Sequence, residues 1–306
     1  MALALVCLNR LNRLKLAAPR IRESGTPTQL GLPWRKITFE TANCKQLGAW
    51  LIPSQPRAPA LVVLHGWGGN AEMMLPLAAP LHQAGYTLLL VDARNHGMSD
   101  GDTFSSLPRF AEDLEHAIDW LKGDSGIEPQ SIGLIGHSVG AGAALLTASR
   151  RIDVAAVVSL AAFAHPESMM RRWLADKGIP FWPLGWYILK YVQYAIGWRF
   201  DDIAPCRTIT QIACPVLIVH GSQDITVPVA DAHRIYAART HEQVRMLVVA
   251  GSHDEYPDID PSLGNIVEFL NVTLKGAPGG GYLERVFVDL LRFSPCAARE
   301  TMGGQD

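Results

Sequence analysis

The strongest constraint on this chain is the motif Gly136-His137-Ser138-Val139-Gly140, which has the pattern G-x-S-x-G. Apolar residues 131–135 precede it, and the small and apolar residues 141–146 follow it. This context predicts a strand, a sharp turn and a helix, the setting of a nucleophile elbow. Small flanking residues let a serine on a strained turn project its hydroxyl past the end of a sheet. We therefore predict Ser138 as a nucleophile; the alternative is a glycine-rich turn with an incidental serine.

Short apolar runs alternate with helical patterns along most of the chain, which predicts an α/β fold with a doubly wound, mostly parallel sheet. Buried strands are expected at residues 60–64, 87–91, 131–135, 154–160, 216–219 and 246–249, after an antiparallel hairpin of residues 36–41 and 47–52. Apolar periodicity and breaker residues place helices at residues 71–84, 107–122, 229–238 and 261–274.

Residues 163–206 interrupt this alternation and hold a large share of the aromatic side chains. An inserted helical cap over an apolar pocket would have this composition, and the segment follows the strand after the elbow helix. An ordinary helical excursion around a small core of its own is the alternative. We expect a catalytic domain over residues 31–275, with the cap inserted at about 163–206.

Both ends of the chain form separate predicted segments. Residues 1–30 are expected to be an amphipathic segment and linker, in which leucines alternate with basic residues: Leu8, Arg10, Leu11, Arg13, Leu14 and Lys15. We expect this helix to dock on the domain or on a second subunit, which would give a homodimer; contact with anionic lipid is the less favoured alternative. Residues 276–306 are expected to be a Gly-rich linker and an amphipathic tail, whose role the sequence leaves open.

Composition narrows the protein class. A chain of 306 residues with 48% hydrophobic residues suits one large α/β domain with an insertion. The net charge of −2 gives no electrostatic case for a nucleic-acid partner. Five scattered cysteines without a C-x-x-C pair fit reduced thiols better than a disulfide framework. Because no run is long enough to span a membrane and the start is a poor secretory signal, a cytoplasmic location is expected.

A nucleophilic serine needs a base, and the base needs a carboxylate to orient it. Both partners should follow late strands of the sheet, in the order serine, acid, histidine. Asp224 follows the apolar residues 216–219, and His253 follows residues 246–249. We predict Asp224 as the acid and His253 as the general base; a loop-capping role is the alternative for Asp224.

An oxyanion site requires two backbone N–H groups near the serine. We assign one to Val139, the residue after the nucleophile, and the other to Trp67, in the loop after the strand at 60–64. His65 is expected to brace that loop. His96 and His137 are expected to pack or donate hydrogen bonds rather than act as bases.

These motifs resemble those of serine hydrolases of the α/β-hydrolase superfamily over residues 36–274, nearly the whole chain. Residues 65–69 resemble the oxyanion loop of the family, and residues 136–140 its elbow. Residues 92–101 resemble its D-x-R-G-H-G-x-S-D-G loop, with Asn95 where glycine is usual. Residues 220–228 and 251–253 resemble its acid and base loops.

The resemblance implies an α/β-hydrolase fold and hydrolysis through a Ser-His-Asp triad without a metal or organic cofactor. A serine nucleophile argues against epoxide hydrolases and dehalogenases, which use aspartate. The nearly acid-free aromatic cap favours a carboxylesterase for small to medium acyl or aromatic esters, feruloyl-type esters included. The alternatives are a lipase or acylglycerol hydrolase at membranes, an aminopeptidase, a thioesterase, and a ligand receptor with this fold. Chain-length preference is not deducible from residue order.

Overall fold

The computed structural model describes residues 9–10, 16–123, 131–254 and 259–276. The predicted C-terminal segment beyond residue 276 and most of the predicted N-terminal helix lie outside these residues. No helix in the described ranges is long and apolar enough to span a membrane. Cys44, Cys206 and Cys214 are free thiols.

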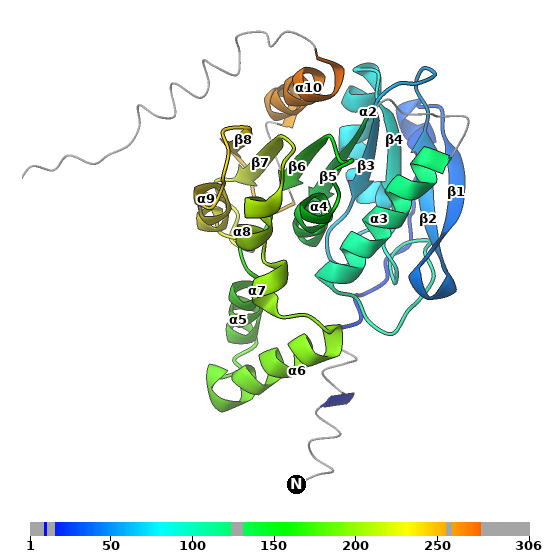
Figure 1. Ribbon diagram of the computed structural model, residues 1–306. Helices are drawn as coiled ribbons and strands as arrows, with labels where there is room; N and C mark the ends of the chain where they lie inside the picture. The colour runs from blue at the N-terminus through cyan, green and yellow to red at the C-terminus, as the bar shows by residue number, and fades with distance from the viewer. Residues whose placement is uncertain (1–8, 11–15, 124–130, 255–258, 277–306) are drawn as a thin grey trace, which may run out of the picture.

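One eight-stranded sheet forms the centre of the molecule, in the order β1-β2-β4-β3-β5-β6-β7-β8 (Figure 1). Its strands are β1 (Arg35–Thr41), β2 (Lys45–Ile52), β3 (Ala60–Leu64), β4 (Thr87–Val91), β5 (Ile132–His137), β6 (Ala156–Leu160), β7 (Val216–Gly221) and β8 (Val244–Val249). β1 and β2 form the predicted antiparallel hairpin, β2 also pairs antiparallel with β4, and the strands from β4 to β8 are parallel. The strand order reverses at β3, so the carboxyl ends of β3 and β5 flank the position where open α/β sheets bind ligands.

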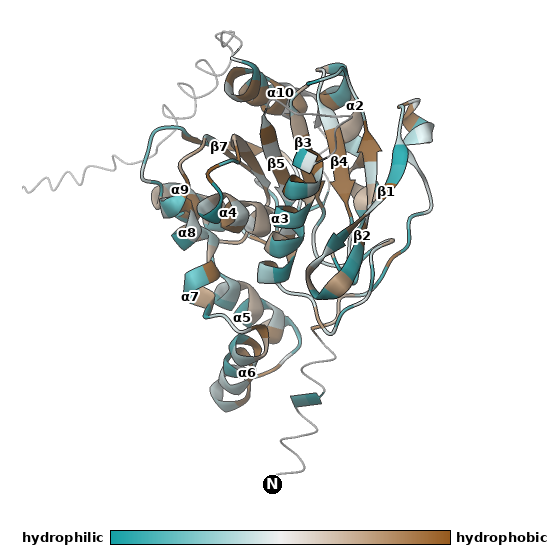
Figure 2. Ribbon diagram, turned by 45° about the vertical axis from the view of Figure 1, so that its right-hand side comes forward, coloured by the Kyte–Doolittle hydropathy of each residue, from teal (hydrophilic) through white to brown (hydrophobic). Residues whose placement is uncertain are grey.

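Helices cover both faces of the sheet. α3 (Leu107–Gly123), α4 (Val139–Arg150) and α9 (Val229–Ala237) pack on one face, and α2 (Leu75–Gln83) and α10 (Ile259–Lys275) on the other. Figure 2 shows the hydrophobic central strands enclosed between these layers. The interior strands are accordingly fully buried, as predicted. The predicted strand at 246–249 is confirmed as β8, but the prediction that this strand is buried is wrong, because β8 lies at the edge of the sheet and is only partly buried.

A helical excursion separates β6 from β7. It contains α5 (Pro166–Asp176), the turn η4 (Phe181–Gly185), α6 (Trp186–Ile196), α7 (Phe200–Ile203), α8 (Pro205–Thr208) and η5 (Ile209–Gln211). Shorter turns are η1 (Pro27–Leu30), η2 (Ala42–Cys44) and η3 (Ala71–Met74). In Figure 1, α5 to α7 stand apart from the sheet, below it.

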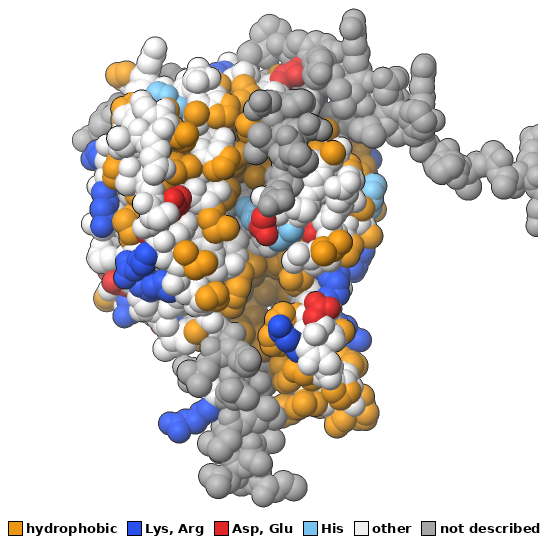
Figure 3. Space-filling view, turned by 180° about the vertical axis from the view of Figure 1, so that it is seen from behind, with side chains coloured by type: hydrophobic (Ala, Val, Ile, Leu, Met, Phe, Trp, Pro, Cys, Tyr) orange, Lys and Arg blue, Asp and Glu red, His pale blue; other side chains and the backbone are white. Residues whose placement is uncertain are grey.

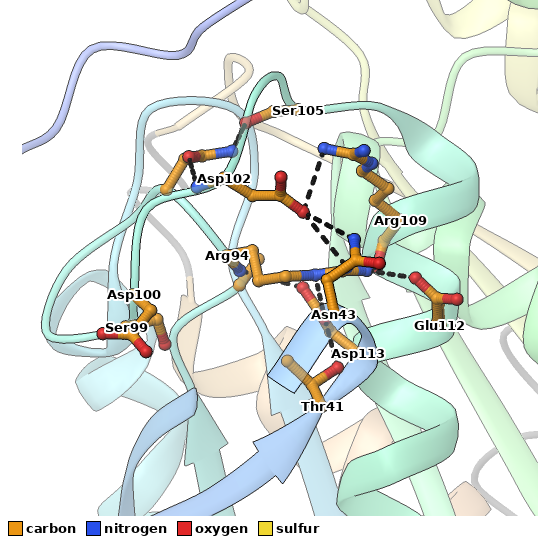
Figure 4. Close-up of polar contacts among 12 residues, drawn as sticks. Thr41, Asn43, Arg94, Ser99, Asp100, Asp102, Ser105, Arg109, Glu112 and Asp113 are labelled. Carbon is orange, nitrogen blue, oxygen red and sulfur yellow. Dashed lines mark hydrogen bonds and ion pairs between the residues drawn. The ribbon is translucent and has the colours of Figure 1, made fainter. Parts of the chain in front are cut away.

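A buried arginine ties the loop after β4 to α3 (Figure 4). The Nε of Arg94 donates to the Oδ1 of Asp113 over 2.7 Å, and the Arg94 backbone N–H donates to Oδ2 over 2.8 Å. Thr41, at the end of β1, donates its hydroxyl to the same carboxylate over 2.9 Å. Arg94 also forms ion pairs with Asp102 and with the half-exposed Glu112. The buried guanidinium of Arg94 and the buried carboxylate of Asp113 therefore neutralise each other, and their contacts join the loop after β4, the end of β1 and α3.

We expect Asp113→Asn to lower the free energy of unfolding by about 3 kcal/mol, because it leaves the buried Arg94 without its main counter-charge. Urea unfolding followed by circular dichroism measures this loss. Glu112→Gln is the matched control: its carboxylate pairs with the same guanidinium but is 42% exposed, so the loss should stay within about 1 kcal/mol. Equal losses in the two variants would contradict this account of the loop.

Candidate active site

Ser138 lies on a sharp turn between β5 and α4, with a φ of +54° that non-glycine residues rarely adopt. The turn is closely packed. A Cβ on Gly136 would lie 2.2 Å from the Gly140 carbonyl oxygen, and one on Gly140 would lie 2.4 Å from the His65 oxygen. Only glycine fits at either position, so the G-x-S-x-G pattern reflects a real steric requirement. The structure thus has the strand-turn-helix geometry that the motif predicts.

The three side chains predicted as a triad form one hydrogen-bonded chain. The Nε2 of His253 lies 3.0 Å from the Ser138 hydroxyl, and its Nδ1 lies 2.7 Å from the Oδ2 of Asp224. Asp224 follows β7 and His253 follows β8, so residues distant in sequence meet at the carboxyl edge of the sheet. An ionised Asp224 keeps the ring proton on Nδ1 and leaves Nε2 to accept the serine proton.

Asp224 is held as an anion although it is buried. Burial alone would raise its pKa, but hydrogen bonds from His220, His253 and the Val227 backbone N–H outweigh burial and hold the pKa well below its usual range. The Val227 amide donates to Oδ1 over 2.7 Å. His220 lies 3.4 Å from Oδ2 and also contacts the Val227 carbonyl over 2.7 Å. His220 is thus a support for the acid loop that the sequence did not reveal as such.

His137 contacts the backbone of His253, the predicted base. Its Nε2 donates to the backbone carbonyl of His253 over 2.9 Å, and the two rings lie 5.0 Å apart. Burial lowers the pKa of His137 and favours the neutral ring. This matches the packing or hydrogen-bonding role that the sequence suggested.

Two buried histidines fix the loop after β3 against the loop after β4. The Ala93 backbone N–H donates to the Nε2 of His65 over 3.1 Å, and the Gly68 N–H donates to the Nε2 of His96 over 3.1 Å. Burial, together with the nearby His96 ring, lowers the pKa of His65 to about 3, and burial also lowers the pKa of His96. Both rings are therefore neutral acceptors. The bracing role expected of His65 agrees with these contacts.

Asp92 also connects the loops after β3 and β4, and it lies beside Glu23 of the N-terminal segment. Its carboxylate accepts from the backbone N–H groups of Ala71 and Met98, over 2.7 and 2.8 Å. Burial and a hydrogen bond with Glu23 raise the pKa of Asp92 to about 8. The carboxylates of Glu23 and Asp92 both lie against Gly97, so residue 23 packs on this loop.

The predicted oxyanion residues border the serine. Val139 is the first residue of α4, where a backbone N–H has no partner within the helix. Gly66, next to Trp67, approaches so closely that a Cβ on it would lie 3.1 Å from the Cβ of Ser138. Gly66, Trp67 and Val139 all line the cavity in front of the serine.

A cavity of about 890 Å³ opens in front of Ser138 and His253. Most of its wall is apolar, and four methionines contribute to it: Met73, Met74, Met169 and Met170. α6 contributes Ile188, Val192 and Ile196, so the excursion between β6 and β7 forms part of the wall. Among the described residues, Lys177 and Asp254 are the only lining residues with a charged side chain. A lining of this kind suits an uncharged, apolar ligand.

The N-terminal segment reaches this cavity, which the sequence did not indicate. Leu16, Ala17 and Pro19 line it, and the Ser105 backbone N–H donates to the Leu16 carbonyl over 2.9 Å. The sequence predicted that the amphipathic helix of residues 1–30 docks on the domain or on a second subunit. Most of that helix lies outside the described residues, but Ala18 and Pro27 are buried against the domain. An extended segment has no helical periodicity in its sequence. The contribution of Leu16, Ala17 and Pro19 to the cavity wall is therefore visible only in the structure.

The described residues contain one group that could ligate a metal: His137, His253 and Asp254, whose ligand atoms lie within 4.8 Å of one another. A metal there would take a ring nitrogen of His253 that now contacts Asp224 or Ser138. Metal binding and the Ser138–His253–Asp224 chain therefore exclude each other.

Comparisons of sequence identify the family. A family model described as serine aminopeptidase, S33, matches residues 55–189. An uncharacterised protein of Mycobacterium tuberculosis, Rv2307c, is 31% identical over 227 residues, which are 74% of each chain. The chain belongs to the α/β-hydrolase superfamily.

Solved structures agree with this fold. The Pyrococcus furiosus esterase Pf2001 superposes with a TM-score of 0.69 at 22% identity, over 84% of this chain and 97% of that one. Est1E of Butyrivibrio proteoclasticus, solved with ferulic acid bound, gives a TM-score of 0.64 at 21% identity, over 78% and 99% of the two chains. At these identities the likeness concerns the α/β-hydrolase fold.

We expect acid to destabilise the protein through His65. Its pKa is about 3 in the fold against an ordinary value of 6.5, so below pH 6.5 the unfolded chain binds a proton that the native chain does not. The free energy of unfolding should therefore fall with decreasing pH by up to about 1.4 kcal/mol per pH unit for this group. Urea unfolding at several pH values between about 5 and 7 measures the slope.

His65→Asn should reduce that slope by up to about 1.4 kcal/mol per pH unit, which corresponds to one bound proton. His233→Asn, on the exposed surface of α9, should leave the slope unchanged. Identical slopes in the wild type and in His65→Asn would show that the neutral His65 ring does not cause the loss of stability in acid.

Proposed function

We propose that the protein is a serine carboxylesterase that uses Ser138 as nucleophile, His253 as general base and Asp224 as the orienting acid. The observation that carries this proposal is the continuous hydrogen-bonded chain from Asp224 through His253 to Ser138, at 2.7 and 3.0 Å, at the wall of an apolar cavity. A serine on a strained elbow beside a neutral imidazole and a buried carboxylate is the arrangement that nucleophilic acyl transfer requires.

The chemistry follows from these contacts. As the Ser138 oxygen bonds to the ester carbonyl carbon, its proton passes to the Nε2 of His253, and Asp224 stabilises the resulting imidazolium. The tetrahedral intermediate collapses, the C–O bond to the alcohol breaks, and His253 returns the proton to the leaving alcohol. Water then attacks the acyl-enzyme through the same proton transfers and releases the acid and free Ser138.

The oxyanion is the next requirement. We assign its two donors to the backbone N–H groups of Val139 and Trp67, because both residues line the cavity next to Ser138. The loop that carries Trp67 is held by the His65 and His96 contacts, so its donors are fixed before substrate arrives. A preorganised donor of this kind lowers the activation free energy by about 3 to 4 kcal/mol.

The size and lining of the cavity support a proposal for the substrate class. Its volume of about 890 Å³ lies near the upper end of the range for pockets that enclose a drug-sized ligand. Flexible methionine side chains adapt to irregular apolar shapes. We therefore propose esters with a medium-sized acyl or aryl group as substrates; the ferulic acid bound in the fold relative Est1E is a ligand of that size.

An aminopeptidase is the alternative that the family description suggests. A free substrate amine needs carboxylates in the pocket. Among the described residues, Asp254 is the only acidic residue that lines the cavity, and Glu167 of α5 pairs with Arg171 on the surface. The scarcity of carboxylates favours the uncharged ester.

We expect p-nitrophenyl esters to be hydrolysed with kcat/KM rising by at least about tenfold from acetate to octanoate, because each buried methylene adds about 0.8 kcal/mol of binding. Ser138→Ala should lower kcat by at least about 10⁴-fold. Absorbance at the nitrophenolate maximum measures both. If the folded wild-type protein binds these esters but does not hydrolyse them, the proposal of an enzyme is wrong and a ligand receptor is the better interpretation.

We expect Asp224→Asn to slow phosphonylation of Ser138 by a fluorophosphonate probe by about 10³- to 10⁴-fold, since the amide no longer fixes the tautomer of His253. Mass spectrometry of the intact protein follows the labelling. Asp254→Asn is the control, because this exposed carboxylate adjoins the base in sequence but lies 3.9 Å from His137. Equal labelling rates in the two variants would remove Asp224 from the triad.

A further inference from the structure

α6 presents apolar side chains on two opposite sides. Its inner side, Ile188, Val192 and Ile196, lines the cavity. Residues 186, 190 and 194 are spaced by four and occupy the opposite side, which is exposed. A globular helix ordinarily turns one apolar stripe inward and polar residues outward. The outer side of α6 departs from this rule.

The outer side of α6 and the adjoining turn η4 form a surface that we call the aromatic face: Trp182, Leu184, Trp186, Lys190 and Tyr194. Trp182 is 70% exposed and Tyr194 is 84% exposed, and Trp186 packs against Trp182 with ring centroids 5.6 Å apart. Figure 3 shows hydrophobic side chains gathered over this lobe of the molecule, beside a hollow. Tryptophan, tyrosine and lysine are the residues that proteins place at a membrane–water interface.

Charge favours an anionic partner for this surface. Residues 177–200 contain Lys177, Lys190 and Arg199 but no Asp or Glu. Residues 1–22 contain five more Lys and Arg and no acidic residue. This second segment meets the first where Tyr187 donates its hydroxyl to Asn9 over 2.7 Å, and Arg10 is exposed there. The two segments hold eight of the chain's 27 basic residues and none of its 29 acidic ones.

We propose that the aromatic face docks on the surface of an anionic lipid bilayer. Tryptophan and tyrosine would enter the headgroup region, and the surrounding cations would attract the negative surface. A second copy of the chain fits less well, because a symmetric contact on the aromatic face would bring the exposed Lys190 side chains of the two copies together.

The docking surface and the cavity share one helix. The bilayer would contact the outer side of α6 while its inner side lines the pocket, one helix diameter away, about 10 Å. A lipophilic ester could therefore pass from the bilayer to Ser138 along a short path. This delivery rests on the proposed esterase function, whereas docking itself does not.

The test uses full-length Ser138→Ala protein, which cannot consume the lipid, with vesicles of phosphatidylcholine alone or mixed with phosphatidylglycerol. We expect co-sedimentation with the anionic vesicles, weaker association with the neutral ones, a blue shift of tryptophan emission, and loss of binding at high salt. Binding without ester hydrolysis by the wild type would leave docking standing and remove the proposed function.

Three variants assign the binding to the aromatic face. Trp186→Gln combined with Tyr194→Gln should weaken the partition coefficient by about tenfold or more, and Lys190→Glu by about fivefold or more. Ile152→Gln removes a fully exposed isoleucine from the loop between α4 and β6 and should bind like the parent. With Ser138 restored, the variants should keep wild-type turnover of a soluble short-chain ester, which shows that they fold.

Equal binding by all variants, or no binding to anionic vesicles, would overturn the proposal. A concentration-dependent dimer in sedimentation velocity that Tyr194→Gln abolishes, without lipid binding, would also overturn it and assign the face to a second copy.

Discussion

The strained backbone of Ser138 is the constraint on which the site depends. A φ of +54° costs a non-glycine residue on the order of 1–3 kcal/mol, and it persists only where surrounding packing leaves no alternative. Here the backbone of β3 presses against Gly140, and the first turn of α4 presses against Gly136. The central sheet therefore sets the position of one hydroxyl, and the loops after β7 and β8 bring Asp224 and His253 to it.

The elements around the site were predictable because each functional residue directly follows a continuous apolar run. Ser138, Asp224 and His253 end three parallel strands, and the carboxyl ends of such strands converge at one edge. The partial burial of β8 was not predictable, since whether a strand is interior or at an edge depends on the order of strands. The links among Arg94, Asp113 and Thr41 were also hidden, because they join three segments that no periodicity relates.

The structure separates its ionic groups from its reaction space. Arg94 and its carboxylates lie between the loop after β4, the end of β1 and α3, whereas the cavity wall is mostly apolar. Neutral His65 and His96 connect the two regions by hydrogen bonds and ring contacts, without an ion pair among the described residues. An anionic Asp224 therefore faces few competing charges, so its field acts mainly on the adjacent His253 ring.

The contribution of Leu16, Ala17 and Pro19 to the cavity wall has a practical consequence for protein production. Further upstream, Asn9 accepts a hydrogen bond from Tyr187 of α6. An affinity tag or fusion partner at the N-terminus would thus be attached to a wall of the reaction chamber, whereas a shortened N-terminus would open that wall to water. Kinetic constants from differently tagged preparations would then describe differently shaped pockets.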